Sequence, residues 1–192
     1  GHHAGRDRAM GFCLFNNVAL GARYAQKRHG VERVFVVDWD FHHGNGTQAM
    51  FWTDPTVFVF SVHCYPAWPY SGLKTEIGAA AGEGFTLNVP LSPGSDSDEY
   101  FAVFDEVLAP AFAEYHPDFV FVSAGFDAHE DDPIDPLHRM RLKSEDFRAL
   151  TDRVVELAEK YADGRIVSVL EGGYNTDALA RSVECHLAGL LR

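Results

Sequence analysis

The 192-residue chain predicts an α/β fold, a three-layer αβα arrangement in which helices cover both faces of a mainly parallel central sheet. Short apolar runs rich in valine and phenylalanine recur along the chain, and such runs are typical of strands buried on both faces. Segments of helical length separate these runs, which indicates right-handed crossovers and therefore parallel strands. We expect the strands at residues 34–37, 57–62, 85–89, 119–122 and 166–170.

Amphipathic segments between the runs predict the helices. The segment 16–29 ends at Gly30, a residue suited to the left-handed conformation that closes a helix. After Ser144, which we expect to be an N-cap, apolar residues recur with a period of about 3.6. Pro110 predicts a kink or a late break in a helix over 98–115. Further helices are expected at 46–52 and 177–191.

Composition limits the classes of protein that fit. No repeat or linker is visible, so we expect one domain over residues 1–192. The net charge of −12 and the lack of a Lys/Arg block argue against nucleic-acid binding. The three cysteines are widely spaced, which suggests a reducing compartment, and we expect the cytoplasm. No apolar run approaches the roughly 18 residues of a membrane span, and no signal peptide is visible.

The beginning of the chain, Gly1-His2-His3-Ala4, has no methionine. A tag remnant and a fragment of a longer protein are the two explanations. Two histidines are not a run of six, so we favour the fragment.

A polar cluster follows the run at 34–37. Asp38, Asp40 and His42 come at the carboxyl end of this expected strand, where ligands bind in open α/β sheets. If the chain stays extended, these three side chains share a face. Asp40 and His42 then form a plausible two-ligand clamp, and a carboxylate–imidazole mixture without thiolate suits zinc, iron or manganese.

Polar residues also follow the other strands: Ser61 and His63, then 123–129, then 171–175. The ends of parallel strands lie on one edge, so these clusters converge there. A zinc hydrolase needs three protein ligands and an open position for water, and Asp127 is the natural third ligand. An isolated aspartate is more often a helix cap or a solvated carboxylate. The recurrence of polar clusters at four strand ends favours the ligand.

A hydrolytic water needs a base, for which His2 and His3 are the candidates, with Asp38 and Asn45 available to fix their tautomers. On local chemistry alone, a terminal His-His is more often a tag or linker. Tyr174 follows two glycines and could stabilise an oxyanion or be a packed core tyrosine.

Aromatic residues and further histidines are less specific. Phe12 and Trp68 could line an apolar slot or be ordinary packing. His43, His63 and His129 are expected to be structural.

Five motifs together resemble the histone deacetylase family, which includes bacterial class II-like deacetylase-like amidohydrolases and acetylpolyamine amidohydrolases. They occur in the family's order and span almost the whole chain. They are Gly1–Ala4, Gly11–Asn17, the run DWDFHHGNGTQ from Asp38, Ser123–Asp127 and Glu171–Asn175. The resemblance implies the arginase/deacetylase fold, zinc-dependent hydrolysis of an N-acetyl amide, and an N-terminally truncated domain.

The resemblance also implies roles for individual residues. Asp40, His42 and Asp127 would bind zinc. His2 and His3 would be the general acid/base pair, held by Asp38 and Asn45, and Tyr174 would polarise the scissile carbonyl. The remaining implied positions are Phe12, Trp68, Ile134 and Gly172 along the substrate tunnel, and Ser61, Val62 and the backbone oxygens of Asp38, Asp40 and His42 around a structural potassium ion.

The implied partner is an acetylated amine, either an acetyl-lysine protein or an acetylpolyamine, and the products would be acetate and the free amine. The ligand set accepts Fe²⁺ as well as Zn²⁺. The sequence does not determine the oligomeric state, and a homo-oligomer is compatible with it.

Two other functions on this fold compete. A dimanganese ureohydrolase needs additional bridging carboxylates, but Gly44 and His129 stand where they are required. A non-enzymatic acyl-amine binding protein would not need all the predicted ligands together with Tyr174.

Overall fold

A computed structural model describes all 192 residues and contains one five-stranded sheet. The strands are β1 (Val34–Asp38), β2 (Val57–Cys64), β3 (Thr86–Leu91), β4 (Phe119–Ala124) and β5 (Ile166–Leu170). Their order is β3-β2-β1-β4-β5, and every pair of neighbours is parallel. The predicted α/β architecture is therefore confirmed.

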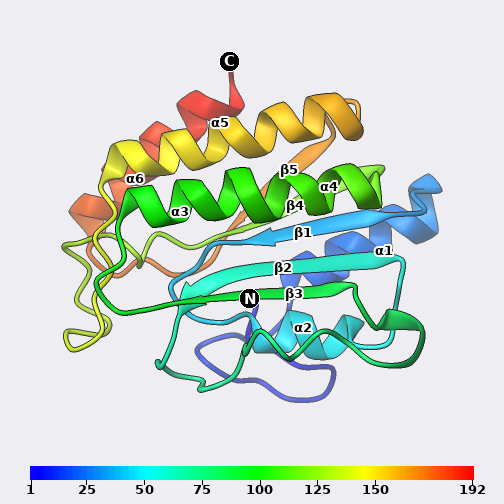
Figure 1. Ribbon diagram of the computed structural model, residues 1–192, viewed down its shortest axis with the longest axis horizontal. Helices are drawn as coiled ribbons and strands as arrows, with labels where there is room; N and C mark the ends of the chain where they lie inside the picture. Colours follow the sequence, from blue (N-terminus) through cyan, green and yellow to red (C-terminus); the bar gives the residue numbers. More distant parts are fainter.

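Helices cover both faces of the sheet. α3 to α6 lie on one face, and α1 and α2 lie on the other (Figure 1). Their bounds are α1 Asn17–His29, α2 Asn45–Phe51, α3 Ser97–Val103, α4 Ala109–Tyr115, α5 Ser144–Tyr161 and α6 Thr176–Leu190. A short 3₁₀ turn occupies Ala80–Gly82, and a π-helical turn, Phe104–Leu108, joins α3 to α4. None of these helices is long and apolar enough to traverse a bilayer.

Side chains alternate between the two faces of the sheet along each strand, so the hydrophobic core consists of two clusters. Phe35 and Val37 of β1 belong to a cluster of 28 buried residues under α3, α4 and α5. Val34 and Val36 belong to a cluster of 10 that includes the buried face of α1. Because successive side chains of a strand point to opposite faces, a continuous apolar run supplies both clusters.

One prediction about the helices is wrong in detail, and the break expected near Pro110 takes the form of a widened turn. Ser144 is the first residue of α5, not its cap, because the Asp146 carboxylate accepts the Lys143 amide N–H at 2.7 Å. The expected helix over 98–115 is interrupted before Pro110. Proline lacks an N–H and its ring crowds the carbonyl four residues earlier. The Ala109 N–H instead bonds to Phe104 O, five residues back, and the widened turn lets the helix continue as α4.

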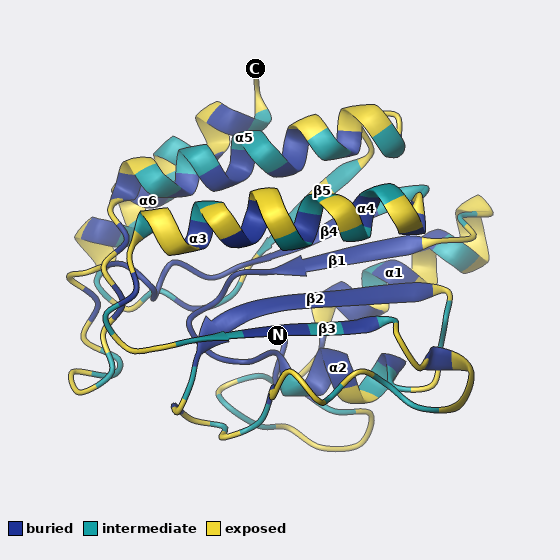
Figure 2. Cartoon of the chain, viewed as in Figure 1, coloured by how far each residue is buried: buried dark blue, intermediate teal, exposed yellow.

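β5 differs from the central strands. Every residue of β1 and β2 is buried, whereas β5 has no fully buried residue, and Val167 and Leu170 are exposed (Figure 2). β5 pairs only with β4. The apolar run at 166–170 is therefore an edge strand with half-exposed apolar side chains.

Candidate metal centre and active site

Asp40, His42 and Asp127 form a buried group, which we term the metal-ligand cluster. The first two follow β1 and the third follows β4, so neighbouring strands bring them together. One ligand atom from each residue lies within 4.8 Å of the others. His42 Nδ1 is 3.1 Å from Asp40 Oδ1 and 2.9 Å from Asp127 Oδ2. The predicted convergence of these side chains is what the structure shows.

Backbone amides orient both carboxylates. Asp40 Oδ2 accepts the Gly172 N–H at 2.7 Å, and Asp127 Oδ1 accepts the Phe41 N–H at 2.9 Å. A side chain at residue 172 would place its Cβ 2.4 Å from Asp127 Oδ2, so only glycine fits against the pair. Gly172, which the resemblance puts near the tunnel, thus lies directly against the ligand carboxylates.

The residues present fit a divalent cation. Asp127 Oδ2 is buried and accepts no hydrogen bond; the nearby His42 Nδ1 is hydrogen-bonded to Asp40 Oδ1 instead. A buried polar atom without a partner costs on the order of 1–3 kcal/mol, so such atoms need an explanation. A cation held by two carboxylate oxygens and one imidazole nitrogen would be the missing partner, and this donor set suits zinc.

The pKa values of the metal-ligand cluster also fit a bound cation. Burial and the neighbouring Asp40 raise the pKa of Asp127 to about 7. Burial opposes ionisation of Asp40 too, but the nearby His2 and His42 together hold the pKa of Asp40 below its usual value. Burial lowers the pKa of His42, yet the two neighbouring carboxylates, Asp127 and Asp40, outweigh burial and raise that pKa to about 10. Two carboxylates buried side by side, Asp40 and Asp127, are what a bound cation would compensate.

The tandem histidines lie beside the cluster with one ring nitrogen of each held. His2 Nδ1 is 2.8 Å from Asp38 Oδ2, and His3 Nδ1 is 2.8 Å from Asn45 Oδ1. Since both acceptors are oxygens, each Nδ1 carries a proton, as inferred from the partners, and the Nε2 atoms are left for chemistry. The two rings are 4.0 Å apart between centroids.

The surroundings of His2 and His3 shift the pKa values of the two imidazoles in opposite directions. Burial lowers the pKa of His2, but the charges of Asp38 and Asp40 outweigh burial and raise it to about 10. Burial, together with the neighbouring His2 charge, lowers the pKa of His3 to about 3. Two adjacent histidines with opposite shifts are a common arrangement in acid/base sites.

Glu171 anchors the backbone of the histidine pair, a role that the sequence did not suggest. Its Oε2 accepts the His2 N–H at 2.9 Å, and its Oε1 accepts the Ser123 hydroxyl at 3.1 Å. The side chain of Glu171 is 1% exposed. The only signal in the sequence was its position at the end of an expected strand.

A slot of about 480 Å³ opens above the cluster. It brings together His3 and His42 with Phe12, Trp68 and Tyr174, and its other lining residues are Gly11, Ile134 and Asp135. The Trp68 ring meets the edge of the His3 ring at 4.6 Å between centroids. Phe12 is 89% exposed and stands 6.4 Å from the Tyr174 ring. The structure therefore places these predicted residues around one opening, and adds Asp135, which the sequence did not single out.

Tyr174 faces this slot with its proton retained. Burial, and then the nearby carboxylates of Asp127 and Asp40, raise the pKa of Tyr174. The phenol can thus donate a hydrogen bond to a group bound in the slot.

Gly11 closes the opposite wall. Its φ of +55° is a conformation that glycine adopts without strain. A Cβ there would lie 2.5 Å from both the His3 and Trp68 rings. Glycine therefore lets the backbone approach the His3 imidazole closely.

A second polar group occupies the same edge of the sheet and is termed the imidazole–amide network: the buried His43, Gln48, His63 and Asn88, with the partly buried Glu76. His43 Nε2 donates to Gln48 Oε1 at 3.0 Å, and Asn88 Nδ2 donates to the same oxygen at 2.7 Å. Gln48 Nε2 in turn donates to Glu76 Oε2 at 2.6 Å.

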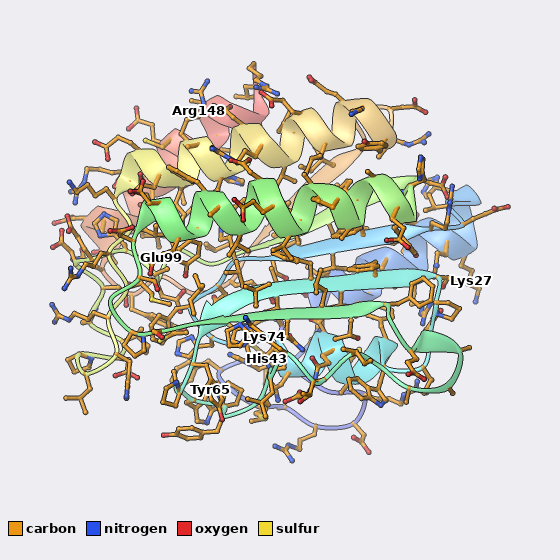
Figure 3. The ribbon with its side chains drawn as sticks, in the orientation of Figure 1. Lys27, His43, Tyr65, Lys74, Glu99 and Arg148 are labelled. Carbon is orange, nitrogen blue, oxygen red and sulfur yellow. The ribbon has the colours of Figure 1, made fainter.

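The rest of the network ties down the loop after β2. His63 Nε2 donates to Gly72 O at 3.0 Å and His43 Nδ1 pairs with the Ser71 hydroxyl at 2.8 Å. Figure 3 shows His43 close to this loop, which also carries Tyr65 and Lys74. The network leaves both imidazoles hydrogen-bonded. His129 is hydrogen-bonded too, its Nε2 pairing with the Ser144 hydroxyl at 3.2 Å, and these contacts fit the expectation that all three histidines are structural.

The residues expected around potassium lie on adjacent strands. Asp38 of β1 and Ser61 of β2 are register partners, and Val62 is buried beside them. The Ser61 hydroxyl pairs with His63 Nδ1 at 2.9 Å. The potassium site itself stays a prediction.

The fold and the site define the class: an α/β protein with a candidate divalent-metal centre at the carboxyl edge of a parallel sheet. The family model described as the histone deacetylase domain matches residues 1–190. The chain belongs to the histone deacetylase family.

Individual relatives agree. A histone deacetylase-like amidohydrolase of Pseudomonas aeruginosa is 48% identical over 178 residues, which are 91% of this chain and 46% of that protein. The rice protein named histone deacetylase 10, chloroplastic, is 45% identical over 95% of this chain and 41% of its own length. The crystal structure of the HDA15 HD domain superposes with a TM-score of 0.92 at 38% identity, over 100% of this chain and 53% of that chain. The chain thus spans less than half the length of these two curated relatives.

Proposed function

We propose that this protein is a zinc-dependent amidohydrolase that removes an acetyl group from an N-acetylated amine. The observation that carries the proposal is the unpartnered Asp127 Oδ2 in the metal-ligand cluster, at the base of a slot that His3 and Tyr174 also line. Family membership supports an activity on amides. Zinc rather than iron(II) is our choice, although the same donors accept either.

Zinc bound there would supply a Lewis acid and lower the pKa of a bound water to roughly 7. Side chains of the protein would supply the hydrogen bonds and the proton transfers. The Tyr174 hydroxyl donates a hydrogen bond to the scissile carbonyl oxygen, where negative charge develops. His3, with its Nδ1 proton held by Asn45, presents an Nε2 lone pair that accepts a proton from water.

The leaving amine needs a proton as the amide C–N bond breaks. His2 and His3 are adjacent, and Asp38 and Asn45 orient their rings, so the pair returns the proton to the amine nitrogen. The new C–O bond takes its oxygen from water, and acetate and the free amine are the products.

Aromatic side chains suggest the shape of the substrate. Phe12 and Trp68 on the slot favour an unbranched aliphatic chain such as that of acetyl-lysine or an acetylpolyamine. The net charge of −12 favours cationic amines through long-range steering. We further propose a structural potassium ion at the predicted oxygens around Asp38 and Ser61.

Acetate release tests the function. Zinc-reconstituted protein, expressed as the full chain, is incubated with an acetyl-lysine peptide and, separately, with N-acetylputrescine. We expect release from at least one substrate. In Tyr174→Phe the turnover should fall by about 10²–10³-fold, the usual cost of one oxyanion donor.

Two results would contradict the proposal. One is that both substrates stay intact although zinc is bound at one ion per chain. The other is that Tyr174→Phe releases acetate at the wild-type rate.

A further inference from the structure

Asp132 is a buried carboxylate for which the mechanism above has no use. Its residue is 3% exposed, and none of the protein's ion pairs includes it. A buried carboxylate without a cationic partner is costly unless hydrogen bonds compensate it. Its partners therefore indicate what it does.

All three of its hydrogen bonds come from backbone amides. Oδ2 accepts the N–H groups of Tyr174 at 2.7 Å and Asn175 at 3.2 Å. Oδ1 accepts the Ile134 N–H at 3.0 Å. One carboxylate thus joins two segments of the slot wall, the loop that carries Ile134 and the turn that carries Tyr174.

Few other contacts fix the position of the Tyr174 side chain. Its hydroxyl has no hydrogen-bond partner within the protein, the residue is 42% exposed, and the aromatic ring beside it belongs to Phe12, which is itself 89% exposed. The turn before it contains Gly173 at a φ of +134°. The position of the phenol therefore depends on how its backbone is anchored.

We propose that Asp132 is a positioning residue that sets where the Tyr174 hydroxyl stands above the metal-ligand cluster, by holding the amides of Tyr174 and Asn175 against the loop of Ile134. This inference rests on the proposed amidohydrolase function. A displacement of about 1 Å at a catalytic group can cost roughly 10²-fold in rate, so the anchor matters to catalysis without touching substrate.

The geometry supplies an isosteric test. Both oxygens of Asp132 accept from N–H donors, whereas an asparagine side chain has one oxygen and one NH₂. In Asp132→Asn either orientation therefore sets an NH₂ group against a backbone N–H. We expect turnover to fall by about 10–100-fold, the range typical of outer partners of a catalytic group, with KM and zinc content near wild type.

Asp118→Asn is the matched control. Asp118 also accepts two backbone amides, those of Glu32 and Arg33, but with one oxygen only and at the opposite edge of the sheet. Asparagine can keep that oxygen in place, so activity should be unchanged.

A double-mutant cycle separates positioning from general stability. If Asp132 acts through Tyr174, Asp132→Asn should cost little further activity in a Tyr174→Phe background. An equal loss of activity in both backgrounds, or no loss in either, would overturn the proposal.

Hydrogen exchange gives a readout that does not depend on activity. In Asp132→Asn the amides of Tyr174 and Asn175 should exchange faster than in wild type, while those of β1 and β4 are unaffected. Unchanged exchange at both amides would overturn the anchoring role. If wild-type protein releases no acetate, the proposed function fails, and hydrogen exchange still decides whether Asp132 holds the turn.

Discussion

The metal-ligand cluster and the imidazole–amide network lie at the same edge of the sheet and are both largely buried. Asp40, His42 and Asp127 leave one oxygen, Asp127 Oδ2, without a hydrogen bond. In the network, by contrast, the Gln48 amide and both nitrogens of His43 are hydrogen-bonded. The difference shows how two polar groups with similar composition can be assigned different roles.

A satisfied network stabilises one arrangement of its loops, whereas an unsatisfied cluster keeps a position free for a ligand. The network holds the loop that carries Trp68, so it shapes the slot through the backbone. Under the proposed function, the cluster would lower the stability of the protein without zinc, as functional sites often do. Three substitutions test this distinction.

The largest effect is expected from Asp127→Asn. Zinc in wild-type protein should raise the free energy of unfolding by about 2.7 kcal/mol when its concentration is 100 times the Kd. The variant loses an anionic ligand, so it should show almost none of this gain and should lose more zinc affinity than the roughly 10–100-fold that outer partners cost. Calorimetry with and without zinc, and metal content per chain, measure both quantities.

The unfolding temperature of Asp127→Asn without zinc further distinguishes the metal-ligand cluster from the imidazole–amide network. Asparagine removes a buried charge beside Asp40, so without zinc we expect Asp127→Asn to unfold at the same temperature as wild type or higher. Asp105→Asn, which changes an exposed ion pair with Arg153, is the control and should keep the zinc response. A marked destabilisation of metal-free Asp127→Asn would show that the cluster is structural.

Gln48→Leu should have the opposite signature. It removes the partner of the buried His43 Nε2 and one of the two partners of the buried Asn88 Nδ2, and a buried group left unsatisfied costs about 1–3 kcal/mol. Urea unfolding should therefore show a clear loss of stability, while zinc stoichiometry stays at the wild-type value.

Gln26→Leu serves as the surface control. Gln26 also makes several hydrogen bonds, including one to Thr56 Oγ1, but these are exposed, so its loss should change stability by at most about 0.5 kcal/mol. If Gln48→Leu lost zinc while keeping its stability, the assignment of roles to the two groups would be reversed.

His186, a buried imidazole outside both groups, extends the comparison to pH and has the smallest expected effect. It lies away from the cluster, between the hydroxyls of Thr151 and Ser168 at 2.6 and 2.8 Å. Burial lowers the pKa of His186 to about 4 from an ordinary 6.5. The unfolded chain therefore binds more protons between these values, so the stability that neutral His186 supplies is present above pH 6.5 and is lost as pH falls towards 4.

The variant His186→Gln isolates this term, because a glutamine amide can donate to one hydroxyl and accept from the other. Between pH 7 and pH 5 the free energy of unfolding of wild type should fall on the order of 1–2 kcal/mol further than that of His186→Gln. Parallel pH profiles would show that His186 does not titrate differently in the folded protein.

The positions of β1, β4 and the candidate metal ligands were predictable from the sequence alone. A continuous apolar run followed by Asp38, Asp40 and His42 carries its own strand signal, and parallel strands bring their carboxyl ends together. The 3.6-residue period likewise predicted α5. These features depend on local pattern and on one general rule of topology.

Features that depend on distant partners could not be predicted. Nothing near Asp132 in the sequence points to the amides of Tyr174 and Asn175, more than forty residues later. The same holds for Glu171 and the His2 amide, 169 residues apart. The π-helical turn before Pro110 and the cap at Lys143 were not predicted, because more than one pattern of local backbone hydrogen bonds is compatible with the sequence at each of these positions.

The sequence by itself determined the α/β class, the order of the elements and the ligand types at the sheet edge, because periodicity and residue chemistry are local properties. Only the tertiary structure decided which polar atoms are paired and which are not. Pairing depends on the positions of groups from several strands and loops at once, to within a few tenths of an ångström. That is why Asp127 Oδ2 and Gln48 Oε1, both buried polar oxygens, have opposite roles.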